Sequence, residues 1–108
     1  KENIINSLKK LFSGATGAIK VTYHQADHMT SLSLNAGILD TEENGIITVY
    51  DDKDSQVYAP KTITIDPLTV DSVVYKDDKS DSQRISSRNV VIHMTDKSRI
   101  ELGTMAIG

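Results

Sequence analysis

Two similar acidic phrases are the first candidates for chemistry in this chain. VYDDKDSQ spans Val49–Gln56 and VYKDDKSDSQ spans Val74–Gln83, so removing two residues from the second gives the first. Carboxylates are the hard oxygen ligands that Ca²⁺ collects in groups of about six to eight. The candidate metal ligands are six aspartates: Asp51, Asp52, Asp54, Asp77, Asp78 and Asp81.

Neither phrase has the pattern of an EF-hand calcium loop. If Asp52 takes the first position, Val57 stands where that loop needs glycine and Ile63 where it needs glutamate. Asp and Ser also favour tight solvated turns. We therefore expect two acidic loops, Asp51–Gln56 and Lys76–Gln83, and no metal site, with calcium binding as a minor alternative.

The histidines are the second candidates. His24 and His28 stand four residues apart, a spacing that suits two zinc ligands on one helical turn, and Asp27 lies between them. This segment reads as a connection between strands, however, and no glutamate separates the histidines as in the metalloprotease motif. We expect His93 on a solvated strand face opposite Glu101, and no zinc site.

The sequence contains no motif for catalysis or for phosphate binding. The glycine-rich stretch 14–17 follows a predicted helix, whereas a phosphate cradle precedes one. The chain has no Cys, no G-x-S-x-G and no S-x-x-K sequence. We expect no enzyme, no catalytic residue and no cofactor.

Basic side chains gather late in the sequence, and they are the candidate contacts for a partner. Asp96 is the sole acidic residue between the first and last of them, which gives a local charge of +3 that could touch phosphates. Four Tyr and one Phe are few aromatic residues for stacking bases. Nucleic-acid binding is therefore possible but not favoured. The four candidates are Arg84, Arg88, Lys97 and Arg99.

Composition and charge bound the class of protein. At 108 residues the chain has the length of one domain, and its net charge of −3 equals the charge of the two acidic loops, which hold six Asp and three Lys. Absence of Cys excludes disulfides and favours a cytoplasmic location. No apolar run is long enough for a membrane span. Asn6 and Lys9 break the N-terminal apolar stretch, so we expect no signal peptide.

Helical periodicity is confined to the start of the sequence. Apolar residues at 4, 5, 8, 11 and 12 form one face of a helix over about 2–12, with Asn3 as a possible N-cap and Gly14 as a possible C-terminal stop. This face either packs on the core or docks on a second subunit or partner.

From residue 18 onward the apolar residues alternate, which predicts short strands. Asn44-Gly45 indicates a hairpin, and Pro60 should lie at a strand edge, bulge or start. An apolar run begins seven residues after each acidic phrase, so one strand–loop–strand unit is predicted to occur twice, with the two loops on the same rim.

The last hairpin permits a register prediction. A three-residue loop at 96–98 pairs Met94 with Ile100 and Ile92 with Leu102, which gives one apolar and one polar face. It needs a left-handed residue near Ser98.

These elements predict an α+β, mostly β fold: one helix and about seven short antiparallel strands in a small barrel-like or strongly curled sheet. The layout resembles small Sm-like and PH-like barrels, a likeness of fold alone. We expect a single domain over 1–108, with the helix at about 2–12, a connection at 13–17 and a β domain at 18–103. The predicted core comprises Ile4, Leu8, Leu11, Ile19, Val21, Tyr23, Leu32, Leu34, Ile47, Val49, Ile63, Ile65, Val74, Ile92, Met94, Ile100 and Leu102.

The favoured role is a non-enzymatic binding or assembly domain that self-associates or binds a protein partner. Small sheets with exposed edges often complete themselves in oligomers. The alternative is a nucleic-acid-associated regulatory protein of small-barrel type.

Overall fold

A computed structural model describes residues 3–13, 19–34, 38–41, 45, 47–50, 62–79 and 85–107. Helix α1 covers Ile4–Phe12, two residues later than expected at its start. Asn3 is its N-cap: its side-chain oxygen accepts hydrogen bonds from the backbone N–H of Ile5 at 2.8 Å and of Asn6 at 3.3 Å. The helix therefore begins where the capping residue satisfies the N–H groups of its first turn.

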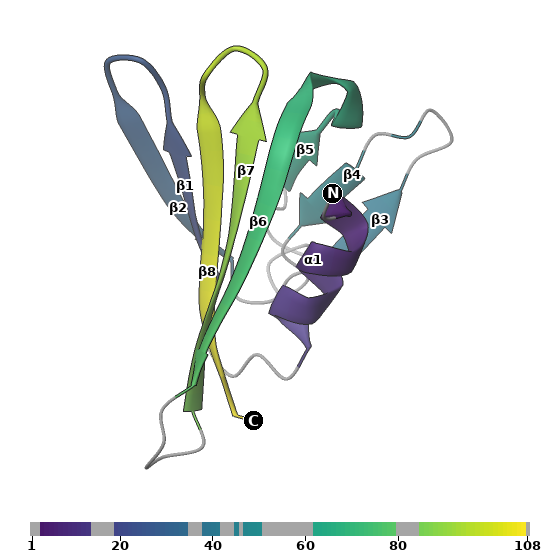
Figure 1. Cartoon of the computed structure of the whole chain (residues 1–108), viewed down its shortest axis with the longest axis vertical. Helices are drawn as coiled ribbons and strands as arrows, with labels where there is room; N and C mark the ends of the chain where they lie inside the picture. The colour runs from purple at the N-terminus through teal and green to yellow at the C-terminus, as the bar shows by residue number, and fades with distance from the viewer. Residues whose placement is uncertain are drawn as a thin grey trace, which may run out of the picture.

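Two antiparallel sheets follow (Figure 1). The larger has the order β2-β1-β8-β7-β6, and the smaller has the order β3-β4-β5. A short 3₁₀ helix, η1 (Pro67–Thr69), leads from the small sheet into β6. The strands are β1 (Ile19–His24), β2 (Met29–Leu34), β3 (Ile38–Thr41), β4 (Ile47–Tyr50), β5 (Thr62–Ile65), β6 (Val70–Lys79), β7 (Ile85–Met94) and β8 (Arg99–Ile107).

The mostly antiparallel β fold with one N-terminal helix is confirmed, but the barrel is not. Within the described residues neither sheet closes on itself or curls strongly, because β2 and β6 stand at opposite edges of the five-stranded sheet. Its apolar inner face is covered instead by α1, which packs on β6, β7 and β8, and by the small sheet. Two layers over one core make closure unnecessary.

The core agrees with the expected residues except at a few positions. Tyr23, Leu32, Ile4 and Met94 are only partly buried. Val90 is fully buried, although it was not expected in the core. The buried apolar residues are Leu8, Leu11, Ile19, Val21, Leu34, Ile47, Val49, Ile63, Ile65, Val73, Val90, Ile92, Ile100 and Leu102.

Val74 was wrongly placed in the core. It is 39% exposed, whereas Val73 is 7% exposed. Strict alternation from Val70 would turn residue 74 inward, but the pairing of β6 with β7 shifts between Val70 and Ser72. Because such a bulge adds one residue to the strand, each later residue of β6 faces the opposite side of the sheet from the one that alternation predicts.

The register of the β7–β8 hairpin differs by two residues from the expected one. Ile92 pairs with Ile100, and the turn is Thr95–Lys97, where Lys97 has a φ of 76°. Lys97 N donates to Met94 O at 3.1 Å, which closes a tight turn. A shift of two leaves the two faces unchanged, so the expected apolar face is confirmed although the expected pairs are wrong.

The predicted strand–loop–strand unit occurs twice, as β4–β5 and β6–β7. The two copies lie in different sheets. The second acidic loop was expected to begin at Lys76, but β6 continues to Lys79, because Lys76–Lys79 pair with the start of β7. The expectations for residues 14–17, Asn44, Pro60 and the first acidic loop, and for the shared rim that depends on it, lie outside the described residues.

Candidate self-association surface

The structure describes two of the six candidate calcium ligands, and it does not bring these two together. Asp77 and Asp78 are neighbours on β6, so their side chains lie on opposite faces of the sheet. No cluster of three or more His, Asp or Glu suited to a metal occurs in the described part of the chain. The other candidates, Asp51, Asp52, Asp54 and Asp81, lie outside it.

The three histidines have different neighbours. His24 ends β1 on the outer face of the five-stranded sheet, where its Nε2 lies 3.3 Å from Glu101 Oε2. His28 sits in the β1–β2 turn with its Nδ1 2.8 Å from Asp27 Oδ1. His93 pairs with Arg99 and not with Glu101 as expected.

Glu101 is the centre of a polar cluster on that outer face. Arg99 Nε donates to its Oε1 at 2.9 Å. The hydrogen bond from Arg99, followed by the charge of His24, holds the pKa of Glu101 below its usual range, against the opposing effect of burial. This cluster is an ion-pair network between strands β1 and β8, without the ligand number of a metal site.

Arg88 contacts helix α1. Its Nη1 donates to the carbonyl oxygens of Lys10, at 2.8 Å, and of Ser13. Its Nε lies 3.8 Å from Asp77 Oδ2. These carbonyls are at the C-terminal end of α1, where a helix favours a cation. A guanidinium that donates to two carbonyls at this helix end ties α1 to β7.

Tyr75 completes the same contact. Lys10 Nζ lies 5.2 Å above its ring, within reach of a cation–π interaction. Burial and then the Asp77 carboxylate raise the pKa of the Tyr75 hydroxyl. Two residues of α1, Leu8 and Leu11, are fully buried, so α1 is part of the core.

The three predicted cations that the structure describes therefore form no common patch. Arg88 faces inward to α1, and Arg99 faces outward to Glu101. Lys97 occupies the β7–β8 turn, and Arg84 lies outside the described residues.

The two edges of the five-stranded sheet differ in a way that bears on assembly. β6 carries three aspartates and two lysines and starts with a bulge, the devices by which proteins protect an edge from pairing. β2 reads MTSLSL, with no charge, no proline and an unbroken register against β1. Among the described residues β2 pairs with β1 alone. It is thus the unprotected edge.

The hairpin that closes β1 and β2 fixes which backbone groups of β2 point outward. Gln25 N donates to His28 O at 2.9 Å. Hydrogen-bonded and non-bonded pairs alternate along antiparallel strands, and this pairing has no bulge. Leu32 therefore turns its N–H and C=O toward β1, whereas Met29 and Ser31 turn theirs toward the open edge.

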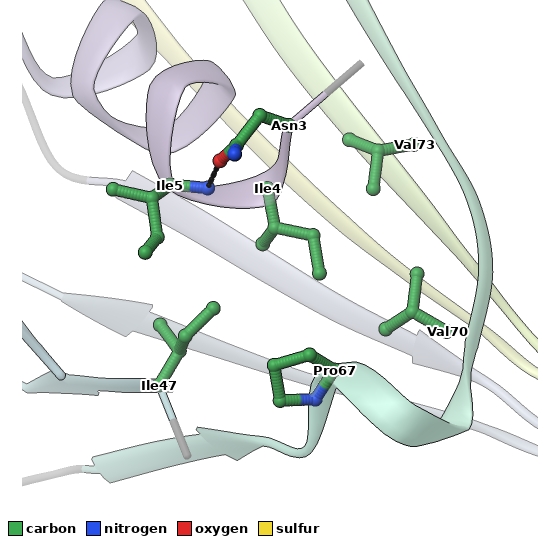
Figure 2. Close-up of a pocket in the computed structure, with 7 residues that line it drawn as sticks. All are labelled: Asn3, Ile4, Ile5, Ile47, Pro67, Val70 and Val73. Atoms are coloured by element: carbon green, nitrogen blue, oxygen red, sulfur yellow. Dashed lines mark hydrogen bonds between the residues drawn. The ribbon is translucent and has the colours of Figure 1, made fainter. Parts of the chain in front are cut away.

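An apolar hollow lies at the other side of the molecule (Figure 2). It has a volume of about 260 Å³ and is open to solvent. In Figure 2 the side chains of Ile4, Ile47 and Val70 converge on it from three different elements, with Asn3 at its rim. The lining residues are Asn3, Ile4, Ile5, Ile47, Pro67, Val70 and Val73.

The sequence reasoning missed both surfaces. The absence of charge in MTSLSL was visible, but nothing local indicates that this strand stands at an edge. The hollow joins α1, β4 and the continuous η1–β6 segment, which are far apart in the sequence.

The comparisons give no relative. No family model matches the chain, and neither a curated protein nor a solved structure matches it. None of the described helices is long and apolar enough to cross a membrane.

Proposed function

We propose that this protein is a non-enzymatic assembly module that self-associates through β2. The observation that carries the proposal is the contrast between the edges: β6 is charged and bulged, and β2 is uncharged and regular. Such an edge is a ready template for another strand.

The partner strand is β2 of a second copy, in antiparallel orientation. A twofold axis at Ser31 places Ser31 opposite its own copy, so that the outward N–H of each Ser31 meets the C=O of the other. The same register sets Leu32 opposite Thr30 and brings the two half-buried Leu32 side chains into diagonal contact on the inner face. The two five-stranded sheets become one continuous sheet.

The expected affinity is modest. Two backbone hydrogen bonds at the Ser31 pair contribute about 1 kcal/mol each, and the Leu32 contact adds a small apolar area. Association costs several kcal/mol of lost translational and rotational freedom. These gains at most roughly offset that cost, so dimers should appear only towards millimolar concentration or where the copies are held close together.

The nucleic-acid alternative has less support. Arg88 and Arg99 are held by contacts within the chain, and Tyr23 and Tyr75 lie on the inner face, where they cannot stack with bases.

Light scattering across a concentration series tests the proposal. Wild-type protein should gain mass as its concentration rises from about 10 µM to about 1 mM. Ser31→Lys should suppress that gain, because it sets two like charges opposite each other at the axis. Ser87→Lys, on the interior strand β7, should behave as wild type. A gain in mass that Ser31→Lys leaves unchanged would refute pairing through β2.

A proline pair gives a second test. Ser31→Pro removes an outward N–H, so it should fold while blocking association. Leu32→Pro removes an N–H that bonds to β1, and it should destabilise the monomer. If both variants unfold alike, the assignment of outward groups in β2 is wrong.

A further inference from the structure

A protruding leucine stands beside the apolar hollow. Leu68 is 90% exposed, and it follows Pro67, which lines the hollow. We propose that Leu68 of one copy inserts into the hollow of a second copy, while the second copy's Leu68 fills the hollow of the first. The occupant of the hollow is thus a second copy of this chain, through a surface separate from β2.

The hollow has the size and chemistry for an aliphatic side chain. An apolar cavity of roughly 150 Å³ accepts a benzene molecule, and this one has about 260 Å³. Five isoleucine and valine side chains and one proline ring leave water without hydrogen-bond partners over most of its wall. Filling it with a leucine removes apolar surface from water on both copies.

Leu68 is presented on a rigid turn. The Asp66 carboxylate accepts a hydrogen bond from Leu68 N at 3.0 Å. The carbonyl of Asp66 accepts from Thr69 N at 2.9 Å and from Thr69 Oγ1 at 2.7 Å. Thr95 N donates to Thr69 O at 2.8 Å, which ties η1 to the β7–β8 turn. Little backbone freedom therefore remains to be lost when the leucine is buried.

The protruding Leu68 and the hollow lie on one patch of the surface, which points to a second copy as the occupant. A twofold interface joins the same patch of two molecules, so it needs a surface that complements itself. A patch with both a protruding leucine and a neighbouring hollow meets that condition, and both leucines are buried in a single contact.

The two proposed contacts lie at opposite edges of the large sheet, because β2 is its first strand and β6, which follows η1, is its last (Figure 1). Two different twofold contacts on one molecule do not close at a dimer. Copies would alternate between strand pairing and leucine exchange in an assembly larger than a dimer, either a closed tetramer or an open chain.

Solution mass separates the two contacts. Wild type should exceed the dimer at high concentration, Leu68→Asp and Ser31→Lys should each stop at the dimer, and the double variant should remain monomeric. Val74→Asp, another exposed aliphatic residue, is the matched control and should match wild type. If Leu68→Asp has the mass of wild type, leucine exchange is overturned and pairing through β2 stands. If Leu68→Asp is a monomer and Ser31→Lys has the mass of wild type, pairing through β2 is overturned and leucine exchange stands. A wild type that stays monomeric overturns both.

Cross-linking gives a direct test, because the chain has no cysteine of its own. Protein carrying Leu68→Cys is mixed with protein carrying Ile5→Cys under mild oxidation, so that a mixed disulfide arises only between molecules. We expect the mixed dimer to form at least tenfold faster than in a mixture of Val74→Cys with Ile5→Cys. Equal rates would contradict insertion of Leu68 into the hollow.

Discussion

Arg88 offers the sharpest test of how α1 is held. Replacement by methionine keeps an unbranched apolar stem in place of the arginine stem but removes both hydrogen bonds to the α1 carbonyls. It also leaves the Asp77 carboxylate without its counterion, near a tyrosine hydroxyl 3.5 Å away. The Arg88 side chain is only 14% exposed, so water cannot easily replace these contacts.

The magnitude follows from those contacts. Hydrogen bonds that involve a charged group contribute about 1.5–3 kcal/mol each, and two on one guanidinium are not fully additive. We expect Arg88→Met to lower the free energy of unfolding by about 3 kcal/mol, a large part of the roughly 5–15 kcal/mol of an ordinary domain. The urea midpoint should fall by about 1–2 M.

Far-UV circular dichroism during urea unfolding measures the effect, since the chain has no Trp. Arg99→Met is the matched control: Arg99 is 43% exposed and its partner Glu101 lies on the solvated face, so the loss should stay below about 1 kcal/mol. Arg88→Lys should fall between the two, because an ammonium lacks the guanidinium fork. Equal midpoints for Arg88→Met and Arg99→Met would refute the anchoring role.

Three further predictions follow from other elements. Because the pKa of Glu101 is lowered in the folded state, Glu101 stabilises the fold above its usual pKa of 4.5, and this stabilisation is lost as the pH falls through the lowered pKa. Glu101→Gln should therefore narrow the difference in urea midpoint between pH 6 and pH 3. An unchanged difference would argue against the Arg99 contact. Lys97→Gly should raise stability by about 0.5–1 kcal/mol in thermal unfolding, since glycine adopts a φ of 76° without strain; a lower melting temperature would contradict this. Val73→Asp should prevent folding, whereas Val74→Asp should lower the free energy of unfolding by about 1 kcal/mol or less, as followed by circular dichroism. The opposite order would mean that β6 alternates without a bulge and that Val74 faces the core.

Local signals predicted the local structure well. The spacing of Leu8 and Leu11 and the capping oxygen of Asn3 are contained within nine residues, so the helix could be placed from the sequence. The faces of the β7–β8 hairpin were also predictable, because alternation survives a shift of two residues. The register was not, since it depended on a lysine adopting a conformation usually left to glycine.

Features that depend on distant contacts could not be predicted. The bulge that turns Val73 inward exists only in the pairing of β6 with β7. The length of β6 reflects pairing of Asp77 with Arg88, which outweighs the turn preference of an acidic phrase. The order of strands in the sheet makes β2 an edge strand, and that order cannot be predicted from the residues of β2 alone. For the same reason the candidate cations were identified by type, but their partners were not.

The pairing of β1 with β8 has a consequence for how the chain folds. Tyr23 lies opposite Ile100, so the central strand pair of the large sheet joins residues 77 positions apart. Closing so long a loop is entropically costly, and sheets built on non-local pairs fold slowly. During synthesis β1 and β2 emerge well before β8, and in that interval β1 carries an unpaired edge as well as β2. A hairpin with two open edges can capture β8 from a neighbouring chain, so slow synthesis at high local concentration should favour strand-exchanged dimers over monomers.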